Sequence, residues 1–256
     1  MKEAFTYMFK DNKFWVKGLC YLGFVFIANL LLNYAQTLLP PCPKCAPPLP
    51  WNYWVCFILG TILNLIPLGY MFTCIKAIID QEETPVLPFI NPLKDLLKGL
   101  KYSVAILIFL LPLLVVTMLI IFGITTLALG SAIGLVISKI FLISVILFVA
   151  LIIIGFNWIF ANKNSLINFY RFKKVFEIIG AGKKKYFGHV GMVFLMFILN
   201  MLLEMGFGYT AGLLGIGTIP GLFVVGILAA LTGTYTVFVI CHLTANSVKR
   251  ELAETV

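Results

Sequence analysis

Six long apolar segments run through the 256 residues of this chain. A helix that crosses a membrane needs about 20 predominantly apolar residues, at a rise of about 1.5 Å each. The chain is 61% hydrophobic and only 11% charged, and its mean hydropathy is +1.05, whereas soluble domains are roughly half apolar and about a quarter charged. The sequence therefore predicts an integral membrane protein. The six predicted spans are residues 18–39, 51–79, 102–122, 133–161, 189–209 and 219–243.

These segments predict helices and exclude the strands of a transmembrane barrel. Barrel strands alternate apolar and polar residues over about ten positions, and residues 104–121 show no such alternation. The first span follows a charged stretch, is 22 residues long and is not followed by a small-residue cleavage site. We therefore interpret it as a retained helix and not as a signal peptide. We expect an all-α six-helix bundle that forms one integral membrane domain over residues 1–256.

Positive charge predicts how the chain is threaded. Lysine and arginine gather in the short cytoplasmic loops of membrane proteins, and 17 of the 19 basic residues lie on every second connection or at the termini. This pattern predicts a multi-pass membrane protein with both termini cytoplasmic. The net charge of +9 then indicates attraction to anionic lipid, at about 1 kcal/mol per basic residue near the surface, and not nucleic-acid binding. The expected headgroup contacts are Lys10, Lys13, Lys17, Lys98, Lys101, Lys173, Lys174, Lys183, Lys184 and Lys185.

A basic, amphipathic stretch precedes each of the three outward-going spans. The three stretches are residues 4–17, 91–101 and 169–185. Such segments usually lie in the plane of the membrane interface, so we expect three helical hairpins, each preceded by an interfacial helix. Lys17, Lys101 and Lys185 are spaced 84 residues apart, which is compatible with internal duplication and equally with a chance match in apolar sequence. The possible repeats are residues 1–79, 91–161 and 169–243.

Residues 68–112 carry a pattern that links two of the spans. A Gly-Tyr pair near a helix end leads through basic residues and a Glu-rich turn to a Leu-Pro pair, followed by an amphipathic segment. The residues in these places are Gly69, Tyr70, Lys76, Glu82, Glu83, Leu87, Pro88, Leu97, Gly99 and Leu100. The chain resembles a prokaryotic polytopic membrane family known only as domain of unknown function 4013. The resemblance implies a location in a prokaryotic cytoplasmic membrane. It departs from that family at residues 89–92, where the family tends to have a tryptophan and acidic residues, and the resemblance implies no activity.

Polar side chains inside the predicted spans mark candidate functional positions. Charged residues at membrane depth are costly and often functional, and Lys139 and Glu204 lie about 9 Å inside the outer ends of their spans. If their helix faces converge, amides on other spans join them around a polar cavity open to the outside. The alternative is structural, with Lys139 reaching the headgroups and the amides forming interhelical hydrogen bonds. The candidate cavity residues are Asn29, Asn33, Gln36, Asn64, Lys139, Asn200 and Glu204.

Cysteines and histidines give weaker signals. Cys42 and Cys45 form a Cys-x-x-Cys pair in a proline-rich outer loop, which favours a loop-stiffening disulfide or free thiols, with zinc and redox chemistry as alternatives. The chain's two histidines lie at span ends, at a depth similar to that of Cys74 and Cys241. They lack the spacing of metal-binding motifs, so we predict no metal and no cofactor.

Motifs of established chemistry are absent from the sequence, which contains no P-loop, His-Glu-x-x-His or Gly-x-Ser-x-Gly motif. We therefore expect a non-enzymatic membrane component: a scaffold, an assembly factor or a complex subunit associated with anionic lipid. Its expected partners are membrane lipids, other membrane subunits or a second copy of the chain. The alternative is a transporter of small solutes or ions, with a polar cavity between the first, second, fourth and fifth spans.

Overall fold

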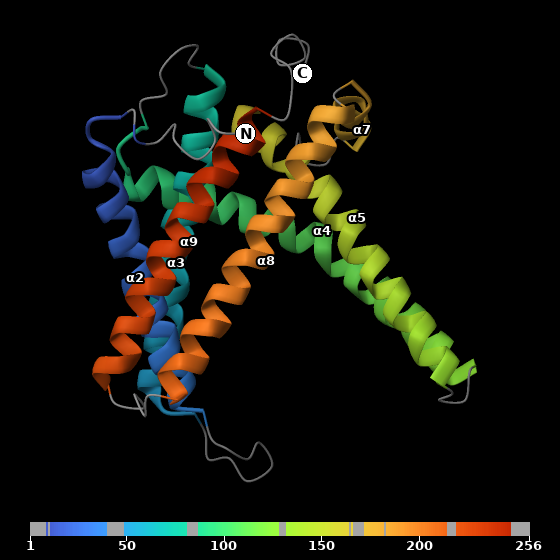
Figure 1. Ribbon diagram of the computed structural model, residues 1–256, viewed down its shortest axis with the longest axis horizontal. Helices are drawn as coiled ribbons and strands as arrows, with labels where there is room; N and C mark the ends of the chain where they lie inside the picture. Colours follow the sequence, from blue (N-terminus) through green and yellow to red (C-terminus); the bar gives the residue numbers. More distant parts are fainter. Residues whose placement is uncertain are drawn as a thin grey trace. The chain divides into compact units, whose positions relative to one another are not determined.

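The computed structural model describes residues 9, 11–39, 49–80, 87–127, 132–163, 165, 172–181, 183–213 and 219–246. All regular structure in these residues is helical (Figure 1). The helices are α2 (Phe14–Thr37), α3 (Trp51–Asp80), α4 (Pro92–Leu127), α5 (Ala132–Lys163), α7 (Phe172–Ala181), α8 (Lys183–Leu213) and α9 (Ile219–Ala245).

Within the described residues, five helices are long and apolar enough to cross a membrane. Helix α9 contributes a shorter apolar stretch, Ala230–Ala245. These findings confirm the all-α fold and indicate a multi-pass membrane protein, whereas the six-span count, the orientation and the repeats stay predictions. The five candidate spans are Phe14–Gln36, Trp51–Asp80, Pro92–Thr126, Val136–Lys163 and Tyr186–Leu203.

Helix α4 begins well before the third predicted span. Pro92 takes the first helical position, where its missing N–H costs nothing. The Asn91 side chain accepts a hydrogen bond from the Lys94 amide at 3.2 Å, and the Asp95 carboxylate accepts one from the Asn91 amide at 2.8 Å. This reciprocal cap starts a helix that continues into the apolar span without a break. The basic stretch at residues 91–101 is therefore the first part of a membrane-length helix, and the separate interfacial helix expected there is not formed.

The third basic stretch does contain a helix of its own, α7. Val175 and Ile178 on this helix are buried, whereas Lys173 is exposed. Val175 packs against Gly155 of α5, where an added Cβ would lie 2.9 Å from the Val175 side chain. In the first basic stretch, residues 4–8 and 10 lie outside the described residues, and α2 begins at Phe14 within it. A separate helix before a span is thus present in the third stretch and absent from the second, within the described residues.

The described residues fall into two compact units. Unit 1 lies within Met1–Leu100 and Met192–Asn246, and it contains α2, α3, the start of α4, most of α8, and α9. Unit 2 lies within Lys101–Gly191, and it contains the rest of α4, α5, α7 and the start of α8. The candidate site described below belongs to unit 1.

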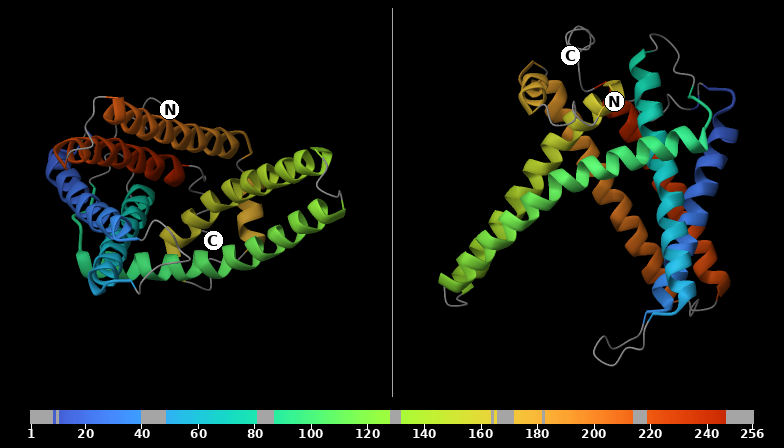
Figure 2. Two further views of the ribbon diagram at one scale, coloured as in Figure 1. Left: turned by 90° about the horizontal axis from the view of Figure 1, so that it is seen from below. Right: turned by 180° about the vertical axis from the view of Figure 1, so that it is seen from behind.

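Helices α2, α3 and α9 of unit 1 lie side by side (Figures 1 and 2). Small residues bring α2 and α3 together. Ala28 and Ala35 on α2 are buried, and an added Cβ on Gly60 of α3 would come within 3.1 Å of the Ala28 carbonyl oxygen and 2.8 Å of the Leu32 side chain. Helices in membranes commonly pack through such small residues, because these let the backbones approach closely.

In unit 2, aromatic side chains join α4, α5 and α7. Phe109 of α4 and Phe172 of α7 both contact Phe156 of α5, with ring centroids 5.3 and 5.2 Å apart. The buried Tyr102 hydroxyl donates a hydrogen bond to the Asn157 side-chain oxygen at 2.6 Å. This bond satisfies a polar group that would otherwise be costly to bury.

Candidate functional site

A pocket of about 820 Å³ lies between α2, α3 and α9 in unit 1. Its described lining is mostly apolar, with aromatic rings such as Tyr53 and Phe57 among the side chains. Pro67 of α3 also lines it, and a proline inside a helix removes one backbone hydrogen bond and favours a bend. The polar side chains of the lining come from Tyr21, Gln36, Tyr53, Thr61, Asn64 and Thr234.

Two of these polar side chains are amides with hydrogen-bonding capacity to spare. Gln36 of α2 and Asn64 of α3 form no side-chain hydrogen bond within the part of the chain that the structure describes. The hydroxyls of Thr61 and Thr234, in contrast, donate to backbone carbonyls of their own helices at 2.7 and 2.6 Å. The two amides, together with the hydroxyls of Tyr21 and Tyr53, are therefore the described groups in the lining that are available to bind a ligand.

The other cavity residues predicted from the sequence are not among the described lining residues of this pocket. Asn29 and Asn33 are exposed on α2, and Asn200 is partly buried on α8. Lys139 is exposed on α5 and belongs to unit 2, while the side chain of Glu204 lies outside the described residues. Of the predicted set, the structure brings two amides together in one pocket, and the suggested pairing of lysine and glutamate stays a prediction.

An aromatic cluster bounds the pocket at Tyr21. The Tyr21 ring on α2 lies 5.8 Å from that of Tyr70 on α3 and 5.5 Å from that of Phe238 on α9, measured between centroids. The rings of Tyr70 and Phe238 are 6.4 Å apart, and all three side chains are buried. Because each ring comes from a different helix, this aromatic cluster joins the three walls of the pocket.

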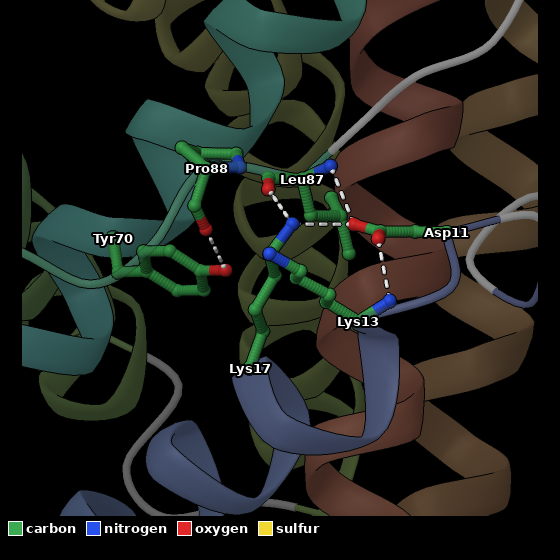
Figure 3. A network of polar contacts seen from close by, with 6 residues as sticks. All are labelled: Asp11, Lys13, Lys17, Tyr70, Leu87 and Pro88. Atoms are coloured by element: carbon green, nitrogen blue, oxygen red, sulfur yellow. Dashed lines mark hydrogen bonds and ion pairs between the residues drawn. The ribbon is translucent and has the colours of Figure 1, made fainter.

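Beyond the aromatic cluster, the start of α2 holds a buried ion pair (Figure 3). Lys17 Nζ lies 2.6 Å from Asp11 Oδ2, and the two side chains are 2% and 4% exposed. Lys17 also donates to the Leu87 carbonyl and lies 4.9 Å from the centre of the Phe89 ring. Asp11 accepts hydrogen bonds from the backbone amides of Lys13 and Leu87 at 2.9 and 3.0 Å. We name Asp11, Lys17 and Leu87 the clasp, because they tie the start of α2 to the segment between α3 and α4.

The clasp changes the acidity of Asp11. Burial by itself raises the pKa of this carboxyl, but the hydrogen bond from Lys17 and those from the amides of Lys13 and Leu87 outweigh burial. The pKa of Asp11 therefore lies below its ordinary value of 3.8, so the carboxylate is charged at neutral pH. Burying an ion pair stabilises a fold only when each charge is well partnered, and both charges of the clasp meet that condition.

Two glycines of the sequence pattern at residues 68–112 form the crossing between α3 and the start of α4. An added Cβ on Gly69 would collide with the carbonyl oxygen of Asp95, and one on Gly99 would collide with that of Leu65. Each of these oxygens belongs to the residue four positions before the other glycine, so the two helices contact one another reciprocally. Any side chain at Gly69 or Gly99 would push the helices apart.

The remaining described residues of the pattern hold the segment that follows α3. The Tyr70 hydroxyl donates a hydrogen bond to the Pro88 carbonyl at 2.8 Å (Figure 3). Leu87, the preceding residue, supplies both its carbonyl and its amide to the clasp. The Gly-Tyr and Leu-Pro pairs therefore build one connected structure at this end of unit 1.

The basic residues expected to contact headgroups lie in unlike surroundings. Lys17 departs from the expectation, because its ammonium is held inside the clasp and its side chain is 2% exposed. The side chains of Lys10 and of residues 183–185 lie outside the described residues. The exposed or partly exposed members are Lys13, Lys98, Lys101, Lys173 and Lys174.

The cysteines contribute no recognisable centre among the described residues. Cys42 and Cys45 lie outside those residues. Cys74 and Cys241 are fully buried in unit 1, and the Cys241 thiol donates to the Met71 carbonyl at 3.6 Å. Within the described part of the chain, no three His, Cys, Asp or Glu side chains come close enough together to hold a metal ion. The two buried thiols pack as small apolar groups.

The helices of the described residues indicate a multi-pass, all-helical membrane protein, and unit 1 contains a pocket. Residues 54–207 match the family described as "Protein of unknown function (DUF4013)", and the chain belongs to this family. The match confirms the resemblance inferred from residues 68–112. Comparisons with curated proteins and with solved structures give no match. Helices α2 and α9, which form two walls of the pocket, lie outside the matched residues.

Several residues of this site were not expected from the sequence. Asp11 stood in a basic stretch that we assigned to the membrane interface, and Lys17 was assigned to headgroups. An acid six positions before a lysine was the available signal, and it is weak. The third member of the clasp, Leu87, acts through its backbone, so its residue type gives no signal at all.

Proposed function

We propose that the protein is a non-enzymatic membrane component that binds a neutral, mainly apolar molecule in the pocket between α2, α3 and α9. The observation that carries this proposal is the combination of about 820 Å³ of space with two unbonded amides, Gln36 and Asn64. Pockets of roughly 300 to 1,000 Å³ with an apolar lining and a few polar groups are typical of small-molecule sites.

The lining also supports the chemical class of the ligand. No lysine, arginine, aspartate or glutamate is among the described lining residues, and a charged ligand without a counter-charge would be costly to bury at this depth. An amide both donates and accepts hydrogen bonds, so a hydroxyl, ester or carbonyl group on the ligand suits Gln36 and Asn64. An amphipathic molecule with one such group and a hydrocarbon body fits this description.

The same lining supports binding rather than catalysis. Acid–base and nucleophilic catalysis in enzymes relies mainly on histidine, cysteine, carboxylate and lysine side chains, and the described lining holds none of these. The hydroxyls of Thr61 and Thr234 already donate to backbone carbonyls. We therefore assign the pocket to recognition of a molecule that leaves chemically unchanged.

A transporter is the second candidate, and the order of elements along α2 favours it. The pocket, the aromatic cluster at Tyr21 and the clasp at Lys17 follow one another along this helix. A solute pathway needs a binding region that is closed at one end by side chains able to separate. The aromatic cluster and the clasp would provide that closure, and transport would require both to open.

Membrane placement forms part of the proposal. The distribution of 17 of the 19 basic residues supports a cytoplasmic position for both termini and for the clasp end of unit 1. Association with anionic lipid follows from the same charges. In this orientation, the clasp lies on the cytoplasmic side of the pocket.

The test is to identify what copurifies with the full-length protein extracted in native lipid discs. We expect mass spectrometry to find a neutral amphipathic molecule in the wild type and to find its occupancy reduced at least tenfold in Gln36→Leu/Asn64→Leu. Asn29→Leu/Asn33→Leu is the matched control, because it removes two amides that lie outside the lining. A stoichiometric protein partner with no small molecule would contradict the pocket proposal and favour a scaffold.

Transport is tested separately in sealed proteoliposomes loaded with the identified molecule. Time-dependent movement that requires the wild-type protein supports the transporter. Tight binding without movement across the bilayer contradicts the transporter and leaves the binding function in place.

A further inference from the structure

A second polar group in unit 1 lies at the crossing of α3 with the start of α4, and it shares no residue with the pocket lining. Lys98 Nζ donates to Thr73 Oγ1 at 2.7 Å, and this hydroxyl donates to Asp95 Oδ1 at 2.8 Å. The other Asp95 oxygen accepts the Asn91 amide at 2.8 Å. These bonds fix the position of the Lys98 ammonium and use both oxygens of Asp95, which offsets one positive charge nearby.

Two more lysines lie on the same parts of the two helices. Lys94 is four residues before Lys98 on α4, so the two share a helix face, and Lys76 is three residues after Thr73 on α3. Lys76 and Lys94 are exposed, and Lys98 is partly buried. None of the three forms an ion pair with a carboxylate of the described residues. Positive charge is therefore in excess here, on two helices whose contact is fixed by Gly69 and Gly99.

We propose that Lys76, Lys94 and Lys98 bind one phosphate group, carried either by an anionic lipid or by a soluble phosphate compound. Ammonium groups form strong, charge-assisted hydrogen bonds to phosphate oxygens. The bond from Lys98 to Thr73 holds one donor in place before the ligand arrives, which lowers the cost of ordering the site. Two accessible donors, Lys76 and Lys94, then complete the contact from opposite helices.

This site differs from a diffuse basic surface in a way that can be measured. Isolated lysines at helix ends attract any anionic headgroup, and their effects depend on charge alone. A built site binds one phosphate group per protein and depends on these three positions. Replacing two lysines elsewhere on the chain should leave the binding of this one phosphate group unchanged.

The experiment titrates the full-length protein in detergent micelles with dioleoyl phosphatidylglycerol and counts bound lipids by native mass spectrometry. We expect one phosphatidylglycerol to bind ahead of any other. Lys76→Gln/Lys94→Gln should weaken this binding about 25-fold, which is about fivefold for each lysine. Lys163→Gln/Lys173→Gln removes two exposed lysines of unit 2 and should change the affinity for this phosphatidylglycerol less than twofold. Lys98→Arg keeps the charge and should retain binding, and a melting curve for each variant verifies that it is folded.

Dioleoyl phosphatidylcholine and inorganic phosphate complete the test. Equal affinity for phosphatidylcholine and phosphatidylglycerol, or an equal loss in the two double variants, would overturn the proposal. Displacement of phosphatidylglycerol by inorganic phosphate assigns the site to phosphate groups in general. Binding of phosphatidylglycerol that inorganic phosphate does not displace assigns it to a lipid-borne phosphate. Gln36→Leu/Asn64→Leu should leave all these results unchanged, so failure of the pocket proposal is distinguishable from failure of this one.

Discussion

The clasp and the pocket both involve α2, but their polar groups differ in hydrogen bonding. In the clasp, Asp11 and Lys17 are almost fully buried and each has several partners. In the pocket, Gln36 and Asn64 have no hydrogen bond within the described residues. Leaving a buried charge without its partner costs about 3 to 5 kcal/mol. Gln36 is exposed and Asn64 is partly buried, so their unbonded amides cost less than the about 1 to 3 kcal/mol of a fully buried one. The partnered charges of the clasp therefore stabilise the fold. The unbonded amides of the pocket remain able to bind a ligand and lower stability only slightly.

Replacing Gly69 by alanine tests the clasp end most severely. The added Cβ meets the backbone of α4, and a backbone cannot move aside as a side chain can. We expect a loss of about 5 kcal/mol or more, in the range that marks severe overpacking, measured as the fraction of monodisperse protein after heating in micelles. Gly23→Ala on α2 is the control, because nothing lies within 4 Å of an added Cβ there. Equal stability of the two variants would show that the crossing is not a close contact.

Breaking the ion pair should have the next largest effect. Lys17→Met leaves the Asp11 carboxylate buried beside an apolar side chain, and we expect a loss of about 3 to 5 kcal/mol. Lys13→Met removes an exposed lysine from the same turn and should change stability by less than about 0.5 kcal/mol. The double variant Asp11→Asn/Lys17→Met should recover part of the loss, because no charge is left unpaired. A Lys17→Met protein as stable as Lys13→Met would remove the contrast with the pocket.

Acid should weaken the clasp in a defined range of pH. The pKa of Asp11 is lower in the folded protein than its ordinary value, so its contribution to stability is complete above about pH 4. That contribution declines as the pH falls through the lower pKa of the folded state. Melting temperatures from pH 7 to pH 3 should therefore show a difference between wild type and Asp11→Asn that is constant near neutral pH and shrinks below about pH 4. A difference that disappears between pH 5 and pH 7 would assign the effect to another group.

Tyr70→Phe should have a smaller effect, because it removes a single hydroxyl. The hydroxyl donates to Pro88, and its loss should cost about 1 kcal/mol. Tyr21→Phe is matched to it, since the two rings share the aromatic cluster and the Tyr21 hydroxyl has no hydrogen bond within the described residues. We expect chemical denaturation to show a loss for Tyr70→Phe alone. Equal losses would mean that the bond from Tyr70 to Pro88 does not account for the loss.

Asn64→Leu should have the smallest effect on stability. The change replaces an unbonded amide by an apolar side chain of similar size, so we expect stability to stay within about 1 kcal/mol of wild type or to rise. Binding of the copurifying molecule should fall while the melting temperature does not. A large loss of stability would show that Asn64 has a structural role, and the comparison with the clasp would fail at that residue.

The helices could be predicted from the sequence because length and apolar composition are enough to indicate a membrane span. The second span was predicted at residues 51–79, and α3 covers Trp51–Asp80. The start of α4 was assigned to a separate interfacial helix, because its lysines suggested a position outside the membrane. The cap formed by Asn91 and Asp95 instead begins the long helix there. The capping residues determine where α4 begins, and the average polarity of residues 91–101 does not indicate this position.

The site could be predicted only where residue type and depth carry the information. Gln36 and Asn64 were identified because polar side chains inside a span are uncommon. Asn29 was included because it shares a helix face with Gln36, but a face covers several directions, and Asn29 is not among the described residues that line the pocket. The clasp could not be predicted, because Leu87 lies 70 positions from Lys17 and 76 from Asp11 in the sequence. Leu87 also contributes only backbone groups to the two bonds.

The clasp also sets an order of events during synthesis of the chain. Lys17 lies near the start of α2, yet the carbonyl and amide that complete the clasp belong to Leu87, which is made 70 residues later. Until Leu87 has been made, the charge of Lys17 has only part of its partners, and such a charge favours the aqueous border of the membrane. We therefore expect α2 to reach its final depth only after α3 and the residues up to Leu87 have been made.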